Sequence, residues 1–100
     1  MIIQDIAFGP EFWKEYEKLP KDVRQRFDRR LKQILVNGKT MPSDNAHKAA
    51  AHGELWIAYI TQHRPAFRYL FTLTPEGVMI IENIGNHDYI EKVLRTITGV

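Results

Sequence analysis

Two side chains in the second half of the chain, His87 and Arg68, are of types that can do chemistry on a phosphate group. Histidine can act as a general acid or base because the pKa of its imidazole lies near neutrality. Arginine can hold a phosphate because its planar guanidinium group matches two phosphate oxygens. His87 follows Gly85-Asn86 at the end of a predicted strand, where its side chain can reach a cleft while its backbone stays anchored.

Arg68 lies in the middle of another predicted strand, whose alternation places Phe67 and Tyr69 on the opposite face. If those aromatic rings pack against helices, Arg68 looks out of the open face of the sheet. Each candidate also has a purely structural interpretation. His87 can be a turn histidine bonded to Asp88, and Arg68 can pair with Glu82 on the next strand.

Further candidates carry a positive charge, a hydrogen-bond donor or an aromatic ring. Some lie in a loop predicted over residues 39–54, one lies at a predicted hairpin tip, and two lie on a predicted basic helix. Aromatic rings can stack on nucleic-acid bases, although Trp56 is expected to pack in the core. The remaining candidates are His47, His52, Lys48, Arg64, Arg29, Arg30 and Tyr89.

Positive charge is concentrated in one part of the chain. The formal net charge is +2. Residues 18–48 contain nine basic side chains and three acidic ones, which makes the rest of the chain acidic. A basic stretch of this kind can bind a polyanion or an acidic protein, or it can be a solvated helix face.

Several classes of site are not expected. The sequence has no cysteine, which excludes a disulfide scaffold, a thiolate zinc site and a cysteine nucleophile. The spacing of His47 and His52 is unusual for metal ligands and no carboxylate cluster accompanies it, so we expect neither a metal nor a cofactor. The first 13 residues include Asp5 and Glu11 and hold no long apolar run, so we expect no signal peptide, no membrane span and a cytoplasmic location.

The hydrophobic pattern predicts one α+β domain over residues 1–100, in the order β-α-α-β-β-β-α. Helical spacing of apolar residues predicts the helices, and period-two alternation or short apolar runs predict the strands. Short connections favour a mostly antiparallel four-stranded sheet with the first two helices, as a hairpin, on one face. The predicted strands are 2–8, 55–62, 67–73 and 78–84, and the helices are 11–19, 21–37 and 88–97.

Four phrases of the sequence, in this order, resemble the RelE/ParE toxin superfamily. WKEYEKLPKDVRQRFDRRLKQIL resembles its helical hairpin, HGELWIAYI the strand entered through a Gly-x-Leu-Trp phrase, FRYLF its aromatic-arginine strand, and IENIGNHDYIEKV its closing strand, turn and His-Asp phrase. The resemblance implies the toxin of a type II toxin-antitoxin system, neutralised by a cognate antitoxin. Most such toxins cleave mRNA on the ribosome, and a ParE-like minority inhibit DNA gyrase.

The resemblance also implies roles for individual residues. His87 matches the catalytic histidine of some members, and Arg68 matches the arginine that clamps the scissile phosphate. The loop that holds His47, Lys48 and His52 often carries basic or histidine residues in the family. Metal-independent RNA cleavage would need a base for the ribose 2′-OH, an acid for the leaving 5′-oxygen and fixed positive charge between them.

Two positions depart from the family pattern. Tyr59 stands where many relatives have arginine, and Glu91 stands where some His-Asp members have an aromatic residue. These departures favour the alternative, a gyrase inhibitor or a non-catalytic binding module. His87 together with Arg68 favours the ribonuclease.

Overall fold

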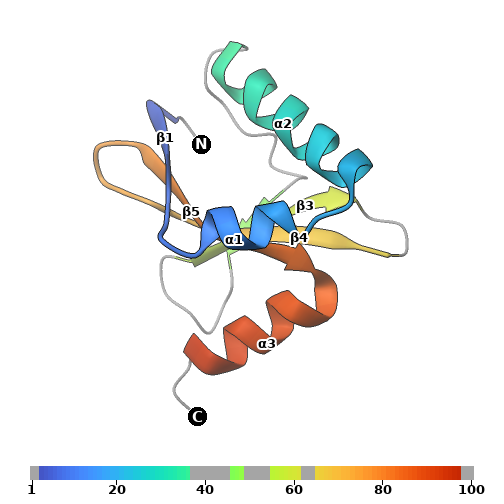
Figure 1. Ribbon diagram of the computed structural model, residues 1–100. Coiled ribbons are helices and arrows are strands. Elements are labelled where there is room, and N and C mark those ends of the chain that lie inside the picture. The colour runs from blue at the N-terminus through green and yellow to red at the C-terminus, as the bar shows by residue number, and fades with distance from the viewer. Residues whose placement is uncertain (1–2, 37–45, 49–54, 62–64, 98–100) are drawn as a thin grey trace.

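The computed structural model describes residues 3–36, 46–48, 55–61 and 65–97 (Figure 1). The fold is α+β, as the sequence predicts. The elements in chain order are β1 (Asp5–Phe8), α1 (Phe12–Glu17), α2 (Lys21–Val36), β2 (Ala46–Lys48), β3 (Leu55–Thr61), β4 (Phe67–Leu73), β5 (Val78–Asn86) and α3 (His87–Ile97).

The strands form one sheet in the order β1-β5-β4-β3-β2. Strand β1 pairs with β5 in parallel, and the other three pairs are antiparallel. The sheet has five strands where the sequence analysis expected four, because β2, within the predicted loop, pairs with Trp56–Ala58 of β3. A strand of three residues is too short to show a period, which is why the sequence pattern missed it.

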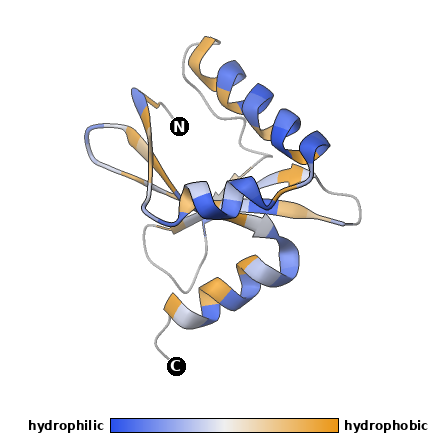
Figure 2. Cartoon of the chain, in the orientation of Figure 1, coloured by the Kyte–Doolittle hydropathy of each residue, from blue (hydrophilic) through white to orange (hydrophobic). Residues whose placement is uncertain are grey.

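Helices α1 and α2 cover one face of the sheet. Figure 2 shows the apolar residues of α2 along one side of the helix and the hydrophilic residues along the other. Phe12 of α1 and Phe27 of α2 are almost fully buried, and their ring centroids lie 5.7 Å apart. Phe27 also contacts Tyr69 of β4 edge to face, at 5.2 Å. The predicted helical hairpin on one face is therefore confirmed.

Helix α3 lies on the opposite side of the sheet from α2 (Figure 1). A second apolar cluster forms there, in which Ile90 and Leu94 of α3 pack on Leu70 of β4 and Ile57 of β3. The sequence analysis expected this face to be open. Helix α3 covers part of it instead, because the strands present apolar side chains on both faces and each face needs a partner.

None of the described helices is both long and apolar enough to span a membrane.

Truncating Leu70 to alanine tests the second cluster. Leu70 is fully buried, and its loss should lower the free energy of unfolding by about 2–5 kcal/mol, because a buried leucine leaves a cavity. Urea denaturation measures the change. Thr72, two residues along the same strand and partly exposed, is the control, and Thr72→Ala should cost less than about 1 kcal/mol. Similar costs for both variants would show that α3 does not pack on this face as described.

Candidate functional site

His87 lies where β5 ends and α3 begins. Its backbone N–H donates a hydrogen bond to the carbonyl oxygen of Ala66, just before β4, at 2.9 Å. One residue earlier, the side-chain oxygen of Asn86 accepts the backbone N–H of Tyr89 at 2.8 Å. This is an N-cap, which satisfies a donor in the first turn that the helix itself cannot. The backbone that carries His87 is thus held by both β4 and α3.

The imidazole of His87 faces two carboxylates. Its Nδ1 lies 3.3 Å from Oδ1 of Asp88, and its Nε2 lies 3.6 Å from Oε1 of Glu91. The contact with Asp88 is the one that the structural interpretation expected. The His87 side chain is 46% exposed and that of Asp88 is 99% exposed, and pairs so exposed contribute little. A phosphate group could therefore reach the ring.

Arg68 of β4 lies opposite Tyr59 of β3 and Gly85 of β5. Its guanidinium carbon is 4.9 Å from the centroid of the Tyr59 ring, a cation–π contact. Within the described residues, its buried Nε has no hydrogen-bond partner. Glu82 is not its cross-strand neighbour, because the register places Gly85 opposite Arg68. The Tyr59 ring thus supports the guanidinium group of Arg68.

The strand register brings Arg68 and His87 to the same end of the sheet. Arg68 pairs with Gly85, and Phe67 pairs with Asn86. His87 follows Asn86 directly and bonds to Ala66. The two strongest candidates of the sequence analysis therefore come from neighbouring strands, close to one another along the sheet.

A buried carboxylate, which the sequence analysis missed, lies beside them. Glu15 of α1 is only 8% exposed. It accepts hydrogen bonds from the backbone N–H of Ile84 at 3.1 Å, from Nδ2 of Asn83 at 2.9 Å and from the hydroxyl of Tyr89. A signal was present in the sequence, since Glu15 sits on the same helical stripe as Phe12 and Leu19, where an acidic residue must have partners.

Tyr89 is the fourth member of the site. The hydrogen bond to Glu15, burial and the negative charges of Glu15 and Glu11 raise the pKa of Tyr89 to about 12. The phenol therefore stays protonated near neutral pH and can donate but not act as a base. Its ring, 39% exposed, packs against Gly85, where a Cβ would lie 2.5 Å from a ring carbon.

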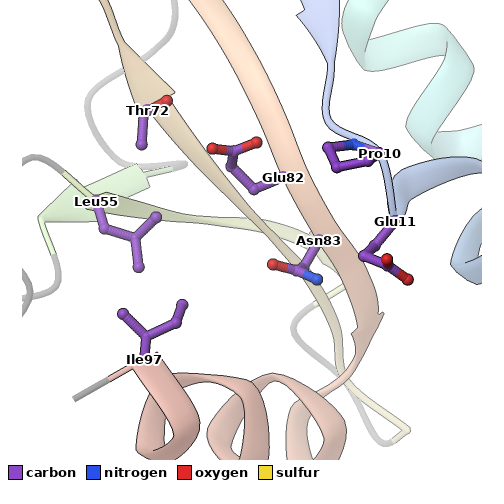
Figure 3. Close-up of a pocket in the computed structure, with 7 residues that line it drawn as sticks. All are labelled: Pro10, Glu11, Leu55, Thr72, Glu82, Asn83 and Ile97. Atoms are coloured by element: carbon purple, nitrogen blue, oxygen red, sulfur yellow. The ribbon is translucent and has the colours of Figure 1, made fainter. Parts of the chain in front are cut away.

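Two hollows flank this region. One of about 260 Å³ is lined by Glu15, Lys18 and Tyr89 together with Leu19, Phe67, Ile84, Gly85 and Asn86. It borders the residues next to His87. A second, of about 560 Å³, has Glu11 and Glu82 as its charged lining residues, and in Figure 3 Leu55 and Ile97 point toward one another at its other side. Carboxylates line both hollows, but only the first also has a basic lining residue, Lys18, so the first suits a nucleotide better.

The other predicted residues are not all part of this site. Lys48 lies on β2, with its Nζ 5.8 Å from the centroid of Trp56. Trp56 stacks on Phe71, with centroids 6.0 Å apart, which supports its predicted packing role. Arg29 and Arg30 lie on α2, across the sheet from α3.

His47 pairs through its backbone with Ile57, and its side chain lies outside the described residues, as do His52 and Arg64. Among the residues that the structure describes, no three or more side chains of metal-binding type form a group that could hold an ion.

No protein-family model matches the sequence, and a search of curated proteins gives no match either. Solved structures do match. A chain of the RelB-RelE antitoxin-toxin complex from Methanococcus jannaschii superposes with a TM-score of 0.70, at 11% identity, over 87% of this chain and 96% of that one. The E. coli toxin RelE in the free state, with two arginine substitutions, superposes with a TM-score of 0.62 at 19% identity, over 95% of this chain and 98% of that one. A chain of the archaeal RelE-RelB complex from Pyrococcus horikoshii OT3 superposes with a TM-score of 0.59 at 16% identity, over 86% of this chain and 96% of that one.

These similarities show the fold: the chain has the fold of RelE toxins. The resemblance predicted from the four sequence phrases is therefore confirmed at the level of the fold.

The raised pKa of Tyr89 predicts a pH dependence of stability. Because the folded pKa, about 12, lies above the ordinary value of 10.0, folding favours the protonated phenol. This contribution is complete below pH 10 and is lost as the pH rises from 10 to about 12. Over that window, urea denaturation should show a larger loss of unfolding free energy for the wild type than for Tyr89→Phe.

The comparison isolates one residue. Tyr16 and Tyr69, whose pKa values are also raised by burial, are present in both proteins. Equal losses in the wild type and in Tyr89→Phe would contradict the contact between Tyr89 and Glu15.

Proposed function

We propose that this chain is the toxin of a type II toxin-antitoxin system and a metal-independent endoribonuclease that cleaves mRNA on the ribosome, in the cytoplasm. The observation that carries the proposal is the register of β4 and β5, which brings Arg68 and His87 to one end of the sheet in a RelE-like fold. A proton-transfer group and a phosphate-binding group are what such cleavage requires.

In the proposed reaction, a base removes the proton of the ribose 2′-OH, and the 2′-oxygen attacks the adjacent phosphorus. The bond from phosphorus to the 5′-oxygen breaks, and an acid protonates that oxygen, which leaves a 2′,3′-cyclic phosphate. His87 performs one of the two proton transfers, and His47 and His52 are the candidates for the other. Arg68 binds the phosphate oxygens as negative charge builds on them. Its stacking on Tyr59 holds the guanidinium group in place.

Other predicted residues have binding roles in this proposal. The ring of Tyr89 is partly exposed and fixed through its hydroxyl, so a base of the RNA can stack on it. Lys48, Arg29 and Arg30 bind RNA phosphates outside the cleavage site, and Arg64, which lies outside the described residues, is a further candidate for RNA binding. None of these contacts depends on a metal ion.

A cognate antitoxin is the proposed protein partner. RelE is found with RelB in the complexes from Methanococcus jannaschii and Pyrococcus horikoshii. This chain leaves large apolar side chains exposed, among them Trp13 at 53%, Leu35 at 45% and Val36 at 70%. Apolar surface of this kind is typical of sites that a partner covers.

One observation favours a second function, inhibition of DNA gyrase. Both nitrogens of His87 face carboxylates, whereas the strongly basic surface lies on α2, across the sheet. In that case the activity would depend on α2 and not on His87. A supercoiling assay with purified gyrase distinguishes the two functions.

Induced expression in a bacterial host, with mapping of transcript 5′ ends, tests the proposal. The wild type should arrest growth and create new 5′ ends inside translated frames. His87→Gln keeps a polar side chain of similar size but cannot transfer a proton near neutral pH, so it should lose these ends, as should Arg68→Ala. Arg26→Ala, which removes an exposed arginine of α2, is the control and should cleave as the wild type does. Undiminished cleavage by His87→Gln would refute the assignment.

Replacing Glu91 tests the electrostatics around His87. The Glu91 carboxylate lies 3.6 Å from Nε2 of His87, where it repels an approaching phosphate. Glu91→Gln should strengthen RNA binding by about two- to fivefold at low salt, and less at high salt because mobile ions screen the charge. Fluorescence anisotropy with a labelled RNA measures this. Glu17→Gln makes the same change at an exposed position of α1 and should have a smaller effect on binding. Equal effects of the two variants would mean that only the net charge of the protein matters.

A further inference from the structure

The Glu15 carboxylate holds the chain on both sides of His87. On one side, it binds the side chain of Asn83 and the backbone N–H of Ile84, at the end of β5. On the other side, it binds the hydroxyl of Tyr89, in the first turn of α3. His87 lies between these attachment points, and its own N–H is fixed to Ala66. The chain around His87 is therefore fixed at three places: at the end of β5, at the His87 N–H and in the first turn of α3. Together these contacts set the direction in which α3 leaves the sheet.

Stability alone does not account for a carboxylate at this position. Taking a charge out of water is costly, and apolar replacements of buried ionic groups are often neutral or stabilising. Glu15 lies near two buried apolar residues, Phe12 of α1 and Leu19 just after it. What a carboxylate provides, and an apolar side chain cannot, is directed hydrogen bonding to several donors at once. Here those donors belong to two different elements, β5 and α3.

We propose that Glu15 is a positioning residue for the candidate catalytic site, acting through Tyr89 to fix the first turn of α3 and with it the imidazole of His87. The proposal rests on the proposed function for its effect on cleavage, but its geometric part does not. Gly85 contributes, because only a residue without a side chain lets the Tyr89 ring lie this close to the strand.

The chain offers a matched control. Tyr16, next to Glu15 on α1, donates its hydroxyl to both carboxylate oxygens of Asp28 on α2, at 2.8 Å each. Tyr16→Phe thus removes a phenol–carboxylate contact of the same kind, but between α1 and α2 and away from α3. Tyr89→Phe keeps the ring and removes only the hydroxyl. Glu15→Gln keeps the size of the side chain and removes its charge.

The experiment measures two quantities on each folded variant. Proton–nitrogen NMR of the histidine side chains, with the His87 signals assigned by their loss in His87→Gln, reports the surroundings of the imidazole. Cleavage of a translated RNA, followed as a function of substrate concentration, separates kcat from KM. Circular dichroism fixes a temperature at which every variant is folded.

We expect Tyr89→Phe and Glu15→Gln to shift the His87 signals and to lower kcat by about 10- to 100-fold with little change in KM, because misplacement by a fraction of an ångström affects the reacting geometry more than binding. Tyr16→Phe should leave both quantities as in the wild type. Unshifted His87 signals in Tyr89→Phe, or an equal fall of kcat in Tyr16→Phe, would overturn the proposal. A wild type that does not cleave RNA would instead refute the proposed function, while the NMR comparison would still decide the positioning role.

Discussion

The unequal lengths of β1 and β5 impose the constraint on which the rest of the site depends. Strand β1 pairs with β5 only over Val78–Ile81, but β5 continues to Asn86. Past that pairing, the edge of β5 carries buried backbone N–H groups that need acceptors. Helix α1 follows β1 directly and lies along this part of β5, and Glu15 supplies the acceptor for Ile84. The same carboxylate also binds the hydroxyl of Tyr89, in the first turn of α3.

Covering both faces of the sheet gives the two candidate residues their surroundings. Helix α3 packs on Leu70 and leaves Arg68, two residues earlier, only partly covered. Arg68 is therefore partly shielded from water, which strengthens its cation–π contact with Tyr59. It also lies at the end of the sheet where β5 leads into His87. Charge placed between an apolar layer and solvent interacts more strongly than charge in open water.

The sequence predicted the elements that have a clear period. The apolar stripes of α2 and α3 and the alternation of β4 are patterns among residues close together in the sequence. They can therefore be recognised from the sequence alone. The sequence analysis missed β2, which is too short, and it paired Arg68 with Glu82, because no local pattern reveals how far one strand is offset from the next. It also missed Glu15, whose three partners lie 68, 69 and 74 residues away. His87 and Arg68 were predicted from residue type and from the resemblance, and only the structure places them at the same end of the sheet.

Those long separations have a consequence for how the protein comes into being. A contact between residues some 70 positions apart closes a large loop, and folds rich in such contacts assemble slowly. Until α1 has docked beside β5, Glu15 cannot bind Ile84 and Tyr89, even if β4 and β5 are already paired. The surroundings of His87 are thus complete only after segments from both ends of the chain have come together.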